Sequence, residues 1–246
     1  MKFLKNLTLF ICFFIGFAQC KKEKSKNTSK AISLAEIYDK ATKQQPVESY
    51  EAINKILASF KQVNYYQLDK NYVQKAGLTP QLYGYRTFYI IKGKDVFKYL
   101  VGTFRVQDFL PDDEYAKKNL ENLQAGHTQY LLLDTKLLYR FLDLLKALKA
   151  KGYKPNFEID DGFRYPTFND KTGGAKGSLH THGMAVDIDI ADVDGNGKIE
   201  KADKKIILDL VENQIIKDKG GVGRYPWSQT VHFDVRGWYA RWDKQN

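Results

Sequence analysis

The amino-acid sequence predicts an α+β fold with an antiparallel sheet at its centre. Several segments have the apolar spacing of amphipathic helices, and several short segments rich in Tyr, Phe, Val and Ile have the composition of strands. Because 43% of the 246 residues are hydrophobic and 14% are aromatic, the chain can bury a sizeable core. This composition excludes wholesale disorder.

Helices are expected in three places. Apolar residues recur at helical spacing in residues 32–60, which predicts two helices there. Residues 134–153 predict the clearest helix, with Asp134 as its N-cap and Gly152 at its end. The predicted buried stripe of this helix comprises Leu137, Leu138, Phe141, Leu144, Leu145 and Leu148. Residues 201–216 predict a further helix.

Strands are expected before and after the clearest helix. Residues 83–109 are rich in β-prone side chains and punctuated by Gly, so they predict strands and a hairpin. Short β-prone pieces follow at residues 156–160, 184–190 and 230–235, and the helix of residues 201–216 lies between the last two. No internal repeat is visible.

The first 20 residues have the pattern of an export signal. Two lysines precede an apolar run from Leu7 to Ala18, which is short for a membrane span but suits a secretory signal peptide. The ending FAQC resembles a bacterial lipoprotein lipobox with Cys20 as the lipidated residue, although Gln19 stands where a small residue is usual. The alternatives are an ordinary cleaved signal and a retained anchor. A mature chain with one cysteine has no internal disulfide.

The formal net charge of +10 is concentrated near the N-terminus. Residues 21–30, KKEKSKNTSK, read as a basic linker that carries a net charge of +4, and two more lysines lie in the leader. A basic tether beside an anionic bilayer explains this excess better than a nucleic-acid footprint does. We therefore expect no nucleic-acid partner.

Three residues offer the donor types of a catalytic zinc site. His180 and Asp187 lie in SLHTHGMAVD, where Gly183 permits a tight turn between them, and His232 lies in TVHFDV. A catalytic zinc takes three protein ligands and keeps a fourth position open for water. By spacing alone the pattern is weak, because a lone histidine in an apolar strand is more often a structural residue.

The stretch SLHTHGMAVD fits the pattern Ser-x-His-x-x-Gly-x-Ala-x-Asp and resembles the zinc D-Ala-D-Ala carboxypeptidase family, which has the Hedgehog/D,D-peptidase fold. Three further pieces occur in the family's order: YLVGTF, then IDDGFRYPTFN with Asp161 where Ser is usual, then GGVGRYPWSQTVHFDVRGWYARW. The last piece is similar to the closing segment of the murein endopeptidase branch. Together these pieces cover about residues 97–246, and the first 96 residues carry no such resemblance.

The resemblance implies an antiparallel sheet flanked by helices, with His180, Asp187 and His232 as zinc ligands. It also implies that Arg164 pairs with a substrate carboxylate, for which a planar bidentate donor is suited. An arginine in a surface turn is the alternative for Arg164. Ser178 matches the family's serine and is expected near the ligand loop or the substrate. The implied chemistry is metal-assisted hydrolysis of an amide bond in peptidoglycan peptides.

The general base is the uncertain part of this site. Several branches of the family place an acid three residues before the last histidine ligand, but Gln229 occupies this position and cannot take a proton. Asp234 lies two residues after His232 and therefore projects from the same strand face. Asp234 is either the base or a partner that orients His232. His182, beside His180, either stabilises the developing oxyanion or has no role.

Residues 192–203, DVDGNGKIEKAD, match an EF-hand-type calcium loop and locally resemble dockerin loops. Gly197 takes the position of the sharp turn, and Asp203 replaces the usual Glu at the last position. The expected calcium ligands are Asp192, Asp194, Asn196, Lys198 through its carbonyl, and Asp203. The alternative is an acidic turn between a strand and a helix. If calcium binds, we expect a structural role.

The sequence therefore predicts a monomer that consists of four parts and is an exported, lipid-anchored protein of the cell envelope. These are a lipoprotein-type signal at residues 1–20, a basic linker at 21–30, an accessory region at 31–96, and a zinc peptidase-like domain at 97–246 that contains the calcium loop. The accessory region is open to three readings: a spacer, a lid or a wall-binding part. A non-catalytic module that keeps both ions and binds cell-wall peptide or a protein is the alternative to an enzyme. A calcium-dependent adhesion protein ranks below both.

Overall fold

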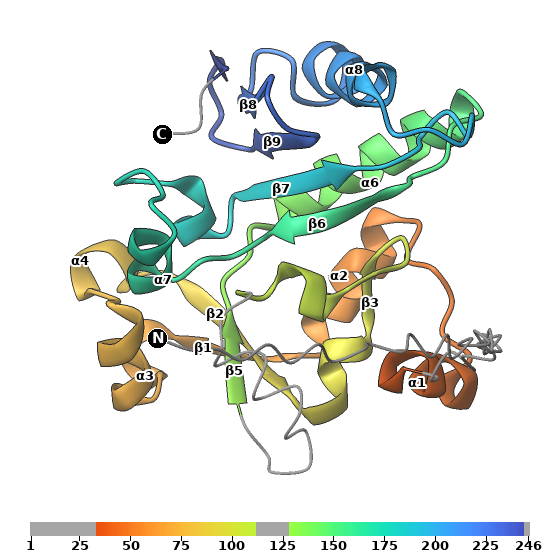
Figure 1. The fold of residues 1–246 in the computed structure, drawn as a ribbon. Coiled ribbons are helices and arrows are strands. Elements are labelled where there is room, and N and C mark those ends of the chain that lie inside the picture. Colours follow the sequence, from red (N-terminus) through yellow and green to blue (C-terminus); the bar gives the residue numbers. More distant parts are fainter. Residues whose placement is uncertain (1–32, 112–127, 244–246) are drawn as a thin grey trace, which may run out of the picture. The chain divides into compact units, whose positions relative to one another are not determined.

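The computed structural model describes residues 33–111 and 128–243 (Figure 1). The chain divides into two units, Met1–Ser33 and the compact unit Leu34–Asn246. The predicted signal peptide, Cys20 and the basic linker lie outside the described residues. Among the helices that the structure describes, none combines the length and the apolar character that a membrane crossing requires.

A five-stranded sheet forms the centre of the C-terminal part. Its order is β10 (Ala240–Trp242), β8 (Gly221–Gly223), β9 (Thr230–Asp234), β7 (Ala185–Ile190) and β6 (Phe157–Asp161). All neighbours pair antiparallel except β10 and β8, which run parallel. The α+β class and the antiparallel central sheet are confirmed.

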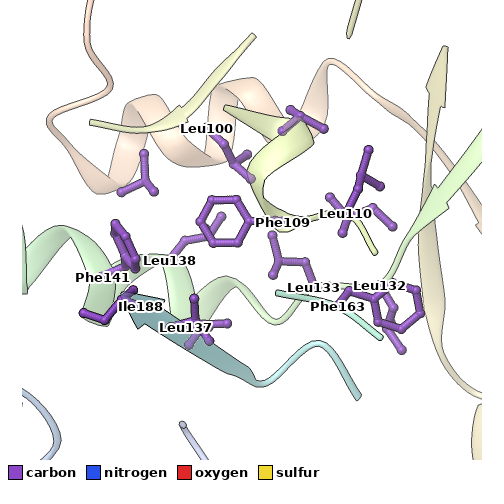
Figure 2. Close-up of a cluster of buried hydrophobic side chains, with 14 of the residues drawn as sticks. Leu100, Phe109, Leu110, Leu132, Leu133, Leu137, Leu138, Phe141, Phe163 and Ile188 are labelled. Atoms are coloured by element: carbon purple, nitrogen blue, oxygen red, sulfur yellow. The ribbon is translucent and has the colours of Figure 1, made fainter. Parts of the chain in front are cut away.

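The helix α6 (Thr135–Ala150) covers one face of this sheet. Its N-cap is Asp134, whose side chain accepts a hydrogen bond from the backbone of Lys136, and Gly152 follows its end with a positive φ of 78°. Leu137 and Phe141 of α6 pack near Ile188 of β7 (Figure 2). Alternation along β7 therefore directs Val186, Ile188 and Ile190 to the core and leaves Asp187 on the opposite face.

The remaining elements of the C-terminal part connect the strands of the central sheet along the chain. A short helix α7 (Pro166–Lys171) and a 3₁₀ turn η5 (Leu179–His182) lie between β6 and β7. The predicted helix after the loop of residues 192–203 is confirmed as α8 (Lys201–Leu210), and it continues as the π-helix η6 (Val211–Ile216).

The N-terminal part contains a second, three-stranded sheet of β1 (Lys61–Asn64), β2 (Thr87–Lys92) and β5 (Thr128–Leu131). The two helices predicted in residues 32–60 are present as α1 (Leu34–Thr42) and α2 (Tyr50–Ala58), and the predicted hairpin is β3 (Tyr99–Val101) with β4 (Phe104–Arg105). Local sequence patterns did not predict α3 (Lys70–Ala76), α4 (Pro80–Tyr83) or the 3₁₀ turns. These turns are η1 (Tyr65–Gln67), η2 (Gly93–Phe97) and η3 (Val106–Phe109).

Residues 34–96 and residues 97–243 share one hydrophobic core. The Tyr83 hydroxyl donates to the carbonyl of Thr181, next to His180, at 3.1 Å, and Thr167 donates to the carbonyl of Lys75 at 2.7 Å. Position 96 therefore marks the limit of the family resemblance and does not coincide with a break in packing.

Candidate metal centre and substrate pocket

One row of residues crosses all five strands of the central sheet. Asp161 of β6 lies opposite Asp187 of β7, and Asp187 lies opposite His232 of β9. Gly223 of β8 follows, and Trp242 of β10 ends the row. Side chains that lie opposite one another on paired strands share a face of the sheet. Strand register thus collects residues that are far apart in the sequence.

The three predicted zinc ligands meet on this face. Asp187 and His232 come from the row, and His180 enters from the 3₁₀ turn η5 that precedes β7. Gly183 ends this turn with a φ of 65°, and a Cβ there would lie 2.2 Å from the carbonyl oxygen of Leu132. Donor atoms of His180, Asp187 and His232 lie within 4.8 Å of one another, and all three residues are buried.

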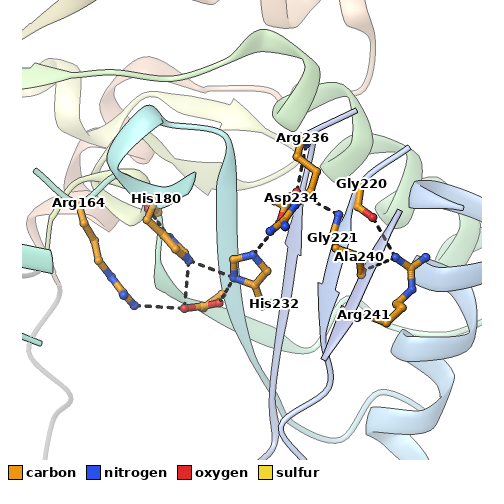
Figure 3. Close-up of polar contacts among 11 residues, drawn as sticks. Arg164, His180, Gly220, Gly221, His232, Asp234, Arg236, Ala240 and Arg241 are labelled. Carbon is orange, nitrogen blue, oxygen red and sulfur yellow. Dashed lines mark hydrogen bonds and ion pairs between the residues drawn. The ribbon is translucent and has the colours of Figure 1, made fainter. Parts of the chain in front are cut away.

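Hydrogen bonds on the outer side of each ring direct the other nitrogen inward (Figure 3). His180 Nδ1 lies 2.7 Å from the carbonyl oxygen of Gly162, which only accepts, so this nitrogen carries the hydrogen. The lone pair of His180 Nε2 then faces Asp187 Oδ2 at 3.3 Å and His232 Nδ1 at 3.1 Å. His232 Nδ1 lies 2.8 Å from Asp187 Oδ1. Two imidazoles and one carboxylate with fixed orientations fit a zinc ion.

A metal ion that binds at this site must displace a proton, because neighbouring carboxylates raise the pKa of His232. Burial alone would lower the pKa of His232, but the carboxylates of Asp187 and Asp234 outweigh burial and raise this pKa to about 9. A cation that takes Nδ1 of His232 must therefore displace a proton from the imidazole near neutral pH. The same two histidines hold the pKa of Asp187 below its usual range, against the effect of burial.

Asp234 lies on the outer side of His232. Its Oδ2 is 3.2 Å from His232 Nε2, and its Oδ1 accepts from the backbone of Gly221 at 3.0 Å. The guanidinium of Arg236 holds both carboxylate oxygens, and Asp234 is fully buried. Of the two roles considered for Asp234, this position favours the orientation of His232, because the carboxylate has its partners already and is not among the pocket-lining residues.

A pocket of about 630 Å³ opens over the three donor residues. It is lined by residues 172–177 together with Asp161, Arg164, Ser178, Leu179, His180, Asp187, Tyr225, His232, Arg236 and Trp242. Lys176 contributes a positive charge to its wall, while the two arginines of the wall, Arg164 and Arg236, pair with carboxylates of the protein. The charge of Lys176 suits a peptide that carries carboxylates.

Arg164 and Ser178, the two predicted substrate-binding residues, both line the pocket. One guanidinium nitrogen of Arg164 bonds to Asp161 and also to Asp187, the latter at 3.1 Å. Arg164 therefore holds a predicted metal ligand in place, and its Nε is buried without a hydrogen-bond partner. Its contact with a substrate carboxylate stays a prediction.

His182 faces away from this pocket. Its ring stacks on Tyr83, with centroids 5.9 Å apart, and it is not among the pocket-lining residues. Burial, together with Arg86, lowers its pKa. The two histidines of SLHTHG are therefore not equivalent: His180 belongs to the donor group, and His182 packs against the N-terminal part.

The predicted calcium loop brings its acids together. Oxygens of Asp192, Asp194 and Asp203 lie within 4.8 Å of one another. Asp192 accepts from the backbone of Gly197 at 2.9 Å, and Asp203 accepts from the backbone of Val193 at 2.8 Å. Asn196 and Lys198 lie in the same turn, where the Asn196 side chain accepts from the backbone of Lys198. Calcium binding stays a prediction.

Four residues line the pocket although the sequence patterns implied no role for them: Asp161, Tyr225, Arg236 and Trp242. Asp161 was visible as a departure from the family's usual Ser, and Tyr225 stood in the motif GVGRYP. Arg236 and Trp242 gave no signal of their own, because only strand pairing brings them to His232. The rings of Trp242 and His232 lie 5.0 Å apart.

An α+β fold whose sheet carries a buried His-Asp-His group beneath a polar pocket defines a candidate metallopeptidase. Residues 97–242 match the family described as peptidoglycan L,D-endopeptidase MepK. The match covers more than half of the chain, so the chain belongs to this family and is a peptidoglycan peptidase. No curated protein and no solved structure matches the chain. The resemblance to the zinc D-Ala-D-Ala carboxypeptidase and murein endopeptidase family is confirmed.

Proposed function

We propose that this protein is an exported, zinc-dependent peptidase that cleaves a bond between an L- and a D-configured centre in peptidoglycan peptides. The observation that carries the proposal is the convergence of His180, Asp187 and His232 at the pocket. The two imidazole rings are held in place by hydrogen bonds to the carbonyl of Gly162 and the carboxylate of Asp234. The description of the family supports the choice of bond.

Zinc bound by His180, Asp187 and His232 would polarise the scissile carbonyl and lower the pKa of a bound water. The remaining work belongs to side chains of the pocket. The carbonyl of Gly162 and the carboxylate of Asp234 hold the two imidazoles in their orientations. Lys176 attracts the carboxylates of the peptide, and Ser178 contacts its backbone.

Asp161 is the group that we assign to the uptake of the proton from water. Among the described residues that line the pocket, the carboxylates are those of Asp161 and Asp187, and Asp187 is a predicted ligand. Arg164 joins the two carboxylates through one nitrogen, which keeps Asp161 beside the metal centre. This assignment replaces Asp234 as the base and leaves Asp234 the orienting role.

Mass spectrometry of muropeptides released from sacculi tests the proposal. Zinc-loaded wild type is expected to release peptides, and His180→Ala is expected to release none. Asp161→Asn should lower the rate while zinc content per chain stays at the wild-type value. If Asp161→Asn has the wild-type rate and Asp234→Asn retains zinc but loses turnover, the two assignments are reversed.

A non-catalytic module that binds cell-wall peptide is the second candidate. The observation in its favour is Gln229, which replaces the acid of other branches. Both candidates bind zinc, so metal content does not separate them. Binding of sacculi by zinc-loaded protein without release of peptide would establish the second candidate.

Two finer parts of the proposal concern the cell envelope and calcium. We infer lipidation at Cys20 from the leader, and incorporation of labelled palmitate by wild type but not by Cys20→Ala tests it. We also infer that residues 192–203 bind calcium for stability, through Asp192, Asp194, Asn196, Lys198 and Asp203. The convergence of the three acids supports this inference.

A further inference from the structure

Tyr225 occupies a backbone conformation that is uncommon for a residue with a side chain. It lies in the turn between β8 and β9 with a φ of 38°, in the left-handed region. Its ring lines the pocket together with Asp187 and His232. Non-glycine residues in this region cost free energy and persist where the surroundings hold them, often at functional sites.

Two basic side chains hold this turn. The Nζ of Lys204, a buried residue of α8, donates to the carbonyl oxygens of Tyr225 at 2.7 Å and of Ser228 at 2.6 Å. Arg224 is fixed to Glu212 of η6 through two nitrogens, at 2.6 and 3.1 Å. The strained backbone of Tyr225 is therefore held from both sides.

A missing side chain at Gly223 allows the Tyr225 phenol to reach Trp242. A Cβ at Gly223 would lie 2.8 Å from Trp242 Nε1 and 2.9 Å from Tyr225 Cζ. The indole nitrogen of Trp242 and the phenol ring of Tyr225 therefore lie side by side over Gly223. Because the indole N–H only donates, the phenol hydrogen of Tyr225 has no acceptor on this neighbour and can be donated into the pocket.

The two arginines of the pocket already serve carboxylates of the protein. Arg164 pairs with Asp161 and Asp187, and Arg236 pairs with Asp234. The phenol of Tyr225 is neutral and has a hydrogen to donate, so it can bond to a substrate oxygen without giving up an internal ion pair.

We propose that Tyr225 is a catalytic residue whose phenol donates a hydrogen bond to the carbonyl oxygen of the scissile peptide bond as that oxygen gains negative charge. This inference rests on the proposed function. In the hydrolysis the oxygen of water bonds to the carbonyl carbon, the C–N bond breaks, and the released amine takes up a proton. Tyr225 keeps its proton throughout. Lys204 acts through Tyr225 as a positioning residue.

The test compares zinc-loaded wild type with Tyr225→Phe and with a control, Tyr85→Phe, at an exposed tyrosine that is not among the pocket-lining residues. By analogy with the loss of one oxyanion donor, Tyr225→Phe is expected to lower kcat by about 100- to 1,000-fold, with little change in KM. Binding of a phosphinate analogue of the scissile bond, measured by calorimetry, should weaken by a similar factor. Zinc content and melting temperature should stay at the wild-type values.

Two outcomes distinguish a failure of the proposed function from a failure of the role of Tyr225. If wild type releases no peptide, the proposed function fails and the role of Tyr225 fails with it. If wild type is active and Tyr225→Phe has the same kcat and phosphinate affinity, only the role of Tyr225 is overturned.

A double-mutant cycle tests Lys204. Lys204→Met should lower kcat in the wild-type background and have little further effect in Tyr225→Phe, because both changes remove the same interaction. A purely structural lysine would lower the melting temperature and reduce kcat by the same factor in both backgrounds.

Discussion

The metal centre and the loop of residues 192–203 are neighbours in the sequence, and both collect acids, yet they are built differently. The metal centre takes His180, Asp187 and His232 from three separate segments, all buried beneath a pocket. The loop takes its acids from one continuous turn, where Asp192 and Asp194 are not buried. The first arrangement depends on tertiary structure, and the second on local sequence alone.

The partners of the acids differ as well. Asp187 faces two imidazole rings and one guanidinium, so its strongest contacts are side chains that a metal can reorganise. Asp203 accepts from the backbone of Val193, Asp194 and Glu200, which caps the start of α8. Because backbone N–H groups already bind the Asp203 carboxylate, this carboxylate stabilises the fold without an ion. This difference predicts that removing a ligand of the metal centre abolishes metal binding and turnover, whereas removing an acid of the loop changes only the melting temperature, by a few degrees.

The largest effect is expected at His180. His180→Ala removes one of three zinc ligands, so zinc content per chain should fall and release of muropeptides should stop. His182→Ala, two residues away, is the matched control, because His182 packs on Tyr83 outside the pocket. Atomic-absorption measurement of zinc and muropeptide release are the readouts. Equal losses in both variants would contradict the assignment of His180.

A smaller effect is expected at Asp234. Asp234→Asn should weaken zinc binding by about 10- to 100-fold, because the residue orients His232 from outside and does not bind the ion itself. Competition with a chelator measures the affinity. At saturating zinc the variant should recover most of the wild-type rate. Persistent loss of turnover at full zinc occupancy would instead mark Asp234 as the base.

The smallest effect is expected in the loop. Calcium at about ten times a dissociation constant of about 1 mM would stabilise the fold by about 1.4 kcal/mol, or roughly 4 °C in Tm. Asp194→Ala should remove this increment, and the exposed Asp218→Ala should keep it. Calorimetry with calcium and with chelator measures the difference. Identical wild-type curves in both conditions would leave residues 192–203 as an acidic turn that caps α8.

Much of the fold was predictable because it depends on local patterns. Asp134 and Gly152 delimit α6 as the capping rules predict, and alternation along β7 separates Asp187 from the core residues Val186 and Ile188. The parallel pairing of β10 with β8 was not predictable, because short strands carry no signal of direction. The packing of residues 34–96 into the common core was also not predictable from local patterns, because contacts such as Tyr83 with Thr181 join segments that are distant in the sequence.

The sequence by itself determined the family, the α+β class and the three candidate zinc ligands. The motif of fixed spacing that contains His180 and Asp187, and the separate segment that contains His232, are properties of the chain. Only the tertiary structure decided what surrounds those ligands. Strand register placed Asp161, Gly223 and Trp242 in one row with Asp187 and His232. Hydrogen-bonded pairing between strands fixes which side chains of different strands share a face, and no local pattern records this pairing.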